Sequence, residues 1–253
     1  MIVSAFIFFL GAAVGSFLSC LIYRLETDQS FITGRSFCPH CRHALAWIDL
    51  IPLLSFVWLR GRCRYCQKPI PWQDLLLEIF TGAIFLWIFN YQFSLLNFFV
   101  ASALIAIFVF DLKHCLIPDE VIYPAILLIL VFRSVEVVFG DSTTSVLPLN
   151  YLGSGLGASL FFWLIYVLSR GKGLGFGDVK LVFLMGLFLG FPGIFVALFF
   201  AFLVGAMTGL ALMIWGHKTL KSELPFAPFL VAGTFFALFY GEAAINFYLS
   251  FFI

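Results

Sequence analysis

Long apolar runs, separated by short polar segments, dominate the chain and predict a series of helices. A bilayer core of ~30 Å needs about 20 apolar residues per spanning helix, and most of these runs reach or approach that length. The sequence lacks the short alternating segments expected of a membrane β-barrel. Eight helices are predicted, over residues 2–23, 73–92, 94–112, 119–139, 147–169, 179–190, 193–215 and 227–251.

The apolar run over residues 181–216 must be interrupted. It contains a single proline and no charged residue. One straight helix of that length would measure about 54 Å, far more than a bilayer core. Phe191, Pro192 and Gly193 lie near its middle and predict the break. The preceding piece, 179–190, is short for a span, so a full crossing and a re-entrant helix both remain open.

The composition is typical of a membrane protein. Of the 253 residues, 63% are hydrophobic and 11% are charged, whereas soluble domains average about 25% charged residues. Because backbone polar groups in lipid must be satisfied within their own segment, an all-α polytopic helix bundle is predicted. The first apolar run has no basic residues before it and no convincing cleavage site after it, so we expect a retained helix. The net charge of +1 says little about partners, and no nucleic-acid partner is expected.

Basic residues predict the orientation of the helices, because Lys and Arg concentrate in cytoplasmic loops. If the polar segment 24–72 is cytoplasmic, every Lys and Arg of the chain except Arg133 lies on the cytoplasmic side. Merging the sixth and seventh predicted helices into one would move Lys218 and Lys221 to the other side. We therefore expect eight spans, with both termini outside the cytoplasm.

Four of the six cysteines form two Cys-x-x-Cys pairs, Cys38 with Cys41 and Cys63 with Cys66. This spacing is typical of a two-knuckle zinc ribbon, in which four thiolates surround one ion and leave no open position for chemistry. The alternative is a pair of disulfides, which a reducing cytoplasm disfavours. The segment is too small to bury a sizeable core, so a structural zinc ion would supply much of its folding energy.

Two carboxylates at membrane depth are candidates for chemistry, since acids there are costly. Asp111 ends one apolar run, and Asp178 immediately precedes another. In the predicted topology both lie at the cytoplasmic side, where a close pair would share one proton and divide the roles of base and acid. The alternative is that they are solvated acids or helix caps. The roles of Glu78 and Glu242, inside other predicted helices, are left open.

The sequence around Asp178 resembles a known signature. Residues 175–181 read Gly-Phe-Gly-Asp-Val-Lys-Leu and are similar to the Gly-x-Gly-Asp motif of polytopic aspartic peptidases, particularly type IV prepilin peptidases. Two positions depart from the family: position 19 is Ser, where the family usually has Asn, and position 113 is Lys, where an acid is common. Other similar segments follow the family's order along nearly the whole chain: residues 15–18, 22–25, both Cys-x-x-Cys pairs, 51–55, 60–63, 111–119 and 225–230.

The resemblance implies an enzyme of the bacterial cytoplasmic (inner) membrane. Such enzymes remove the short basic leader from prepilins and type II secretion pseudopilins at the cytoplasmic face, after a glycine. Many also methylate the new N-terminal residue with S-adenosylmethionine. The resemblance assigns catalysis to Asp111 and Asp178, and zinc binding to the four paired cysteines. It names no residues for the methyl donor, and the sequence has no glycine-rich nucleotide loop after a strand.

The expected parts are a first transmembrane helix (1–23), a cytoplasmic four-cysteine zinc domain (24–72) and a transmembrane aspartic peptidase domain (73–253). Four residues are expected to serve substrate approach. Gly175 and Gly177 would leave the backbone beside Asp178 unobstructed. Pro225 and Pro228 cannot donate regular helical hydrogen bonds, so nearby backbone groups would pair with the cleavage segment.

Other classes of protein remain as alternatives. A preflagellin or signal-peptide-type peptidase would share the Gly-x-Gly-Asp motif without methyltransferase activity. A transporter would more often place its acids near the midplane, within an inverted repeat that is not detected here. A non-catalytic membrane assembly protein would depend on the cysteines and tolerate loss of both aspartates.

Overall fold

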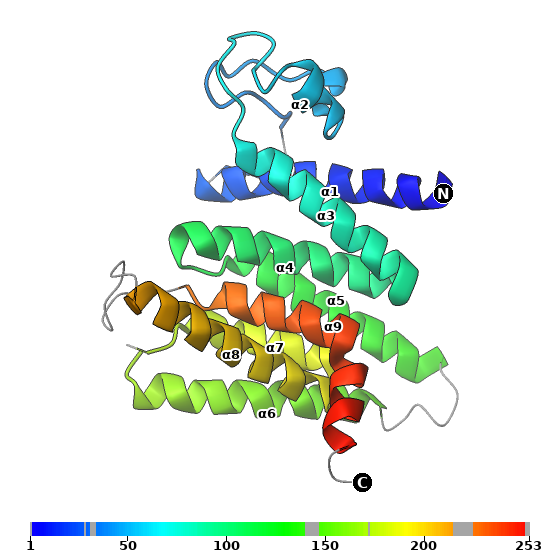
Figure 1. The fold of residues 1–253 in the computed structure, drawn as a ribbon, viewed down its shortest axis with the longest axis vertical. Coiled ribbons are helices and arrows are strands. Elements are labelled where there is room, and N and C mark those ends of the chain that lie inside the picture. Colours follow the sequence, from blue (N-terminus) through cyan, green and yellow to red (C-terminus); the bar gives the residue numbers. More distant parts are fainter. Residues whose placement is uncertain are drawn as a thin grey trace. The chain divides into compact units, whose positions relative to one another are not determined.

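The computed structural model describes residues 2–27, 29–30, 34–139, 147–171, 173–214 and 225–250. Nearly all regular structure in these ranges is helical (Figure 1), which confirms the predicted all-α architecture. The polar segment after α1 contains the short helices η1 (Trp47–Leu50) and α2 (Leu54–Trp58). The long helices lie where the apolar runs predicted them: α1 (Ile2–Glu26), α3 (Trp72–Tyr91), α4 (Leu95–His114), α5 (Asp119–Phe139), α6 (Leu147–Leu168), α7 (Phe176–Leu189), α8 (Gly193–Ile214) and α9 (Ala227–Leu249).

Six of the described helices are long and apolar enough to cross a membrane: α1, α3, α4, α6, α8 and α9. The chain is therefore a multi-pass membrane protein. Helix α5 carries acids at both ends of its sequence. Helix α7 has 14 residues and measures about 21 Å, less than a bilayer core. Lys218 and Lys221, two of the basic residues from which the orientation of the helices was predicted, lie outside the described residues. The orientation therefore stays a prediction.

The predicted break between the sixth and seventh helices is confirmed. Helix α7 ends at Leu189 and α8 begins at Gly193. The Asn150 side chain of α6 binds the turn through both of its polar atoms. Its Nδ2 donates to the Phe191 carbonyl at 3.0 Å, and its Oδ1 accepts from the Phe191 N–H at 3.1 Å. The amide thus satisfies backbone groups that the helix break leaves unpaired.

Arg133, the exception in the charge pattern, has a packing role in α5. Its Nη2 donates to the Phe188 carbonyl at 3.1 Å, in the last turn of α7. Its guanidinium lies 3.6 Å from the centroid of the Tyr151 ring. A cation at a helix C-terminus is favoured by the helix dipole, so this charge stabilises the end of α7.

The chain divides into two compact units, Met1–Ser102 and Ala103–Ile253, and the division falls within α4. In the first unit, α1 packs closely on α3 through glycines. A Cβ added at Gly15 would lie 2.8 Å from the Cα of Glu78, and one at Gly82 would lie 2.9 Å from the Phe8 carbonyl. Small residues at such positions let membrane helices approach closely. The predicted division at residues 23 and 72 stays a prediction.

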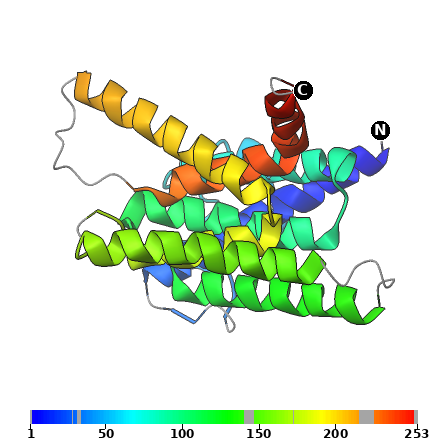
Figure 2. The ribbon, with the colours of Figure 1, turned by 90° about the horizontal axis from the view of Figure 1, so that it is seen from below.

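In the second unit, α7 is the central helix and packs against α5, α6, α8 and α9 (Figures 1 and 2). Its side chains are buried along most of its length. The closest approach is to α6, where a Cβ added at Gly186 would lie 2.5 Å from the Cα of Gly155. A similar approach joins α8 and α9, where a Cβ at Gly233 would lie 2.2 Å from the Ala197 carbonyl oxygen.

The close contact of α6 and α7 gives a first prediction. Gly186→Ala is expected to force the two helices apart and to destabilise the protein by about 1–3 kcal/mol. Gly157→Ala, on α6, is the matched control, because a Cβ there meets nothing within 4 Å. It should leave stability unchanged or raise it by about 0.5–1 kcal/mol. Thermal unfolding of the two purified variants in detergent measures the difference, and equal midpoints would contradict the packing argument.

Candidate active site and metal centre

Asp178 lies in the first turn of α7, at the end of the helix opposite Arg133. Asp178 is only 9% exposed. One carboxylate oxygen, Oδ2, accepts a hydrogen bond from the backbone N–H of Gly175 at 3.2 Å. This contact satisfies a backbone donor that precedes the helix, as an acid in a first turn often does. The side chain is therefore held by its own turn, with a carboxylate at the buried start of the central helix.

Asp111 lies in the last turn of α4 and is 4% exposed. Its Oδ2 is buried and has no hydrogen-bond partner among the described residues. The backbone amide of Ala227, the first residue of α9, interacts with the same carboxyl group. Asp111 and Asp178 are close enough for their charges to interact, although 66 residues separate them in the sequence. The second unit thus places the two predicted aspartates within range of a charge–charge interaction.

Two neighbouring buried carboxyl groups have a defined chemical capacity. Because two negative charges at short range repel, two such groups can share one proton. The ionised partner can then accept a proton from water, while the protonated partner can donate one to a carbonyl oxygen. A buried oxygen without a partner costs stability, and such costs are typical of residues that serve function.

The first turn of α7 is also tied to α5. The Lys180 Nζ lies 2.6 Å from Asp119 Oδ1 and 4.9 Å from the centroid of the Tyr123 ring. Helix α5 begins at Asp119, directly after Pro118, as the sequence predicted. This ion pair was not predicted from the sequence, although Lys180 lies two residues after Asp178. The ion pair fixes the turn that carries Asp178.

The residues expected to aid substrate approach have different surroundings. A Cβ at Gly175 would meet mainly the Asp178 carboxylate, whereas one at Gly177 would lie 3.1 Å from the Ile117 side chain. Pro225 precedes α9, and Pro228 is buried in the first turn of that helix, where a missing N–H is tolerated. Gly177 therefore allows close packing against the connection between α4 and α5, and the roles of all four in substrate binding stay predictions.

The four paired cysteines converge in the first unit. Each pair forms a knuckle with the same hydrogen bonds: the Cys38 N–H donates to the His43 carbonyl, and the Cys63 N–H donates to the Lys68 carbonyl. The residue after each pair, Arg42 or Gln67, has a positive φ, which closes the tight turn. The knuckles are further bounded by antiparallel bridges, Phe37 with Ala44 and Arg62 with Pro69.

The sulfur geometry fits a tetrahedral metal ion. All four Sγ atoms lie within 4.8 Å of one another, and Sγ of Cys38 is 3.9 Å from that of Cys66. A zinc ion with Zn–S bonds of ~2.3 Å requires sulfur separations of about 3.8 Å. All six cysteines of the chain are free thiols, so the structure does not form the alternative disulfides. The residues present therefore fit a metal site with four cysteine ligands.

The pKa values of two thiols in this cluster, Cys38 and Cys66, are shifted in opposite directions. Burial acts to raise the pKa of Cys38, but the backbone N–H groups of Cys41 and His40 outweigh it and lower the pKa to about 7. For Cys66, the Lys68 N–H acts to lower the pKa, but partial burial and the neighbouring thiols raise it to about 11. Four thiolates in this space therefore need a cation to be stable together.

Buried polar groups of the first unit organise the polar segment. Glu78 of α3 accepts a hydrogen bond from the Leu53 N–H at 2.8 Å, and Ser19 of α1 donates to Asp74 of α3. Arg24, in the last turns of α1, donates to the carbonyl oxygens of Ser30, Gly34 and Arg35. Glu78 thus bonds a helix to a loop, a role that was not predicted, whereas Glu242 is exposed in α9.

Comparison with known proteins agrees with these features. Residues 9–92 match the Bacterial Peptidase A24 N-terminal domain, and residues 98–210 match the Type IV leader peptidase family. A prepilin leader peptidase/N-methyltransferase of Bacillus subtilis (strain 168) is 33% identical over 96% of this chain and 97% of its own length. The proteins of that name from Aeromonas hydrophila and Myxococcus xanthus (strain DK1622) are 28% and 35% identical. They match over 98% and 83% of this chain and over 94% and 63% of their own lengths. No solved structure matches.

A polytopic helical membrane protein with a buried aspartate pair and a four-cysteine site is the class that the fold and the site define. The chain belongs to the type IV leader peptidase family, as the motifs predicted. Members of that family are peptidases, so the rival classes of transporter and non-catalytic assembly protein are not supported.

Proposed function

We propose that this protein is an intramembrane aspartic endopeptidase in which Asp111 and Asp178 are the catalytic pair. The observation that carries the proposal is that two buried carboxylates, at the end of α4 and the start of α7, lie within range of each other's charge. The burial of Asp111, at 4% exposure, supports it further, because acids at membrane depth are costly and are functional more often than not.

In the proposed reaction a water molecule is polarised between the two carboxyl groups. The ionised aspartate takes a proton from the water as its oxygen attacks the peptide carbonyl, and the protonated aspartate donates its proton to the carbonyl oxygen. The tetrahedral intermediate then expels the amine, which receives a proton from one aspartate, while a hydroxyl group of the intermediate gives its proton to the other aspartate and restores the pair. The Ala227 amide, beside Asp111, would hold the carboxyl group or the substrate backbone in position.

The family and the names of the relatives support a substrate class for the proposed enzyme. We propose that the enzyme removes the short basic leader of type IV prepilins and type II secretion pseudopilins after a glycine. Cleavage would take place at the cytoplasmic face of the bacterial cytoplasmic membrane, which the distribution of basic residues supports. Pro225 and Pro228, at the start of α9, and Gly175 and Gly177, around Asp178, are proposed to border the path of the cleavage segment.

A second activity, methylation of the new N-terminal residue from S-adenosylmethionine, is proposed from the relatives' names. Cys38, Cys41, Cys63 and Cys66 would hold a structural zinc ion, which supplies folding energy to the polar segment and no open coordination position. Zinc takes no part in the proposed peptide cleavage.

Incubation of the purified protein with a prepilin tests both activities. We expect a product lighter by the mass of the leader, and a further gain of one methyl group when S-adenosylmethionine is present. Mass spectrometry of the product measures both changes. Cleavage without methyl transfer would favour a peptidase lacking the second activity, and an uncut prepilin under conditions where a relative cuts it would contradict the proposal.

A further inference from the structure

A cavity of about 780 Å³ lies in the first unit, between α2, the second cysteine knuckle and the start of α3. Ligand sites in proteins commonly occupy about 300–1,000 Å³, so this volume suits a ligand of moderate size. The side chains that decide what it can bind are Phe56, Val57, Arg60, Arg62, Trp72 and Leu75. The lining side chains are mainly apolar and aromatic, and two arginines, Arg60 and Arg62, also line the cavity.

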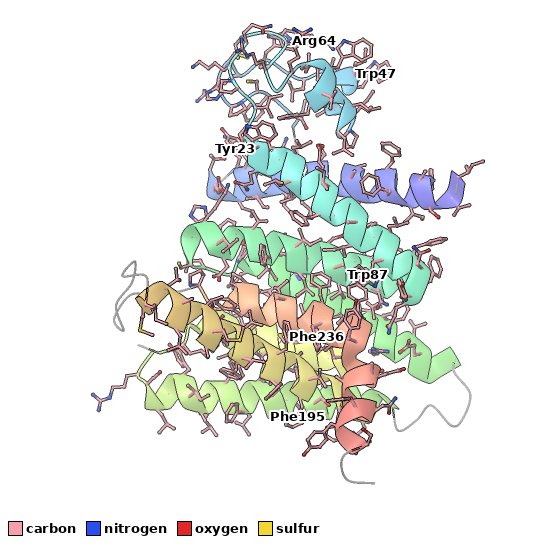
Figure 3. All side chains as sticks on the ribbon, in the orientation of Figure 1. Tyr23, Trp47, Arg64, Trp87, Phe195 and Phe236 are labelled. Atoms are coloured by element: carbon pink, nitrogen blue, oxygen red, sulfur yellow. The ribbon has the colours of Figure 1, made fainter. Side chains whose placement is uncertain are left out.

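Two large apolar side chains that line this cavity are exposed, Val57 at 71% and Trp72 at 70%. In the same polar segment Trp58 is 84% exposed and Trp47 of η1 is 74% exposed; Figure 3 labels Trp47. Exposed apolar side chains that line a cavity are typical of an interaction site. Tryptophan in particular concentrates where a membrane protein meets the boundary between hydrocarbon and headgroups.

The two arginines have no acidic partner among the described residues. Arg60 and Arg62 are exposed, whereas Arg64 is paired with Asp49 at 3.0 Å and Arg24 is buried against backbone carbonyls. A guanidinium binds a phosphate through two parallel hydrogen bonds. Two guanidinium groups without such a partner, beside an apolar wall, therefore suit an anion that carries a large apolar group.

The position of the cavity identifies the source of that anion. Trp72 is the first residue of α3, a helix long and apolar enough to span a membrane. The cavity thus lies beside the first residue of this helix, so we expect it near the level of the headgroups if α3 spans the bilayer. Basic clusters that adjoin membrane helices bind anionic lipids, and a soluble nucleotide would find few polar groups on these walls.

We propose that this cavity binds an anionic phospholipid. Its phosphate would lie between Arg60 and Arg62, and its acyl chains would lie against Phe56, Val57 and Trp72. The bound lipid holds the cysteine-containing segment on the bilayer surface. This inference does not rest on the proposed peptidase activity, because none of these residues belongs to the aspartate pair.

The test titrates the full-length protein, purified in detergent, with phosphatidylglycerol and with phosphatidylcholine of the same acyl chains, and native mass spectrometry counts bound lipid. Arg60→Gln with Arg62→Gln is compared with Arg35→Gln with Arg42→Gln, which removes equal charge from exposed positions of the same segment. Each basic residue contributes about fivefold to binding an anionic lipid. The first double variant should bind phosphatidylglycerol about 25-fold more weakly, and the second should change by less than about twofold.

Several results would overturn the proposal. They are equal affinity of the wild-type protein for the two lipids, an unchanged affinity in the Arg60/Arg62 variant, and equal competition by glycerophosphoglycerol, which has the headgroup without acyl chains. If that variant does not fold, a photoreactive phosphatidylglycerol is applied to the wild-type protein. Cross-links within residues 56–75 support the site, and cross-links confined to other residues contradict it.

Discussion

Replacing either aspartate by asparagine is expected to lower the rate of leader cleavage by about 10³-fold or more. Asparagine keeps the size of the side chain but can neither accept the proton of the attacking water nor donate one as an acid. The rate of prepilin cleavage by Asp111→Asn and by Asp178→Asn, measured with purified enzyme, tests the proposal. Because the two groups act as one pair, the double variant should be no slower than the single ones.

Two controls separate this loss from misfolding. Glu242→Gln removes an exposed carboxylate from α9 and should leave the cleavage rate unchanged. Asp111→Asn should unfold at the same or a higher temperature than the wild-type protein, because it removes a buried charge with an unpartnered oxygen. Cleavage by either single variant at more than about a tenth of the wild-type rate would be incompatible with an acid–base pair.

Loss of the cysteine cluster is expected to have the second large effect. The wild-type protein should contain about one zinc ion per chain, and Cys38→Ser or Cys63→Ser should contain almost none. Zinc binding to such four-ligand segments contributes about 10–16 kcal/mol, more than a small polar segment can replace by packing. Metal analysis, together with limited proteolysis, measures the zinc content and the expected opening of residues 34–70.

The chain supplies a matched control for that experiment. Cys115 is exposed and lies outside the cluster, so Cys115→Ser should retain zinc and resist protease as the wild-type protein does. A strong chelator should give the wild-type protein the cleavage pattern of Cys63→Ser. If Cys63→Ser kept its zinc, or if the purified wild-type protein contained none, the assignment of a structural zinc site would fail.

The sequence alone was sufficient to predict the helices, because each predicted helix depends on a local property of its own residues. Apolar runs predicted the positions of the long helices to within a few residues, and Pro118 and Pro192 marked a start and a break. The spacing of Cys38, Cys41, Cys63 and Cys66 predicted their convergence for the same reason, since each knuckle is a local turn. Helix α7 starts earlier than its apolar run, because Gly175 and Asp178 form its first turn.

The partners of the candidate site residues were beyond prediction, because they come from distant segments. The Ala227 amide lies beside Asp111 only because α9 begins next to the end of α4. The sequence does not reveal that these two helix ends are neighbours. Lys180 and Asp119 could have been singled out as opposite charges near helix starts, yet nothing local selects this pair from the other charges. Glu78 likewise meets the Leu53 N–H through the return of a loop onto α3.

The shortness of α7 has a consequence for how water reaches the reaction. A helix of 14 residues leaves about 9 Å of hydrocarbon thickness that it cannot fill. Arg133 and Asn150 hold its far end, so we expect the deficit to fall at the end that carries Asp178. The hydrocarbon core of the bilayer would be thinner there, or polar groups would lie within it, below the level of the headgroups. Water could then reach Asp178 directly from the membrane surface, and hydrolysis would not require a channel that opens through the helix bundle.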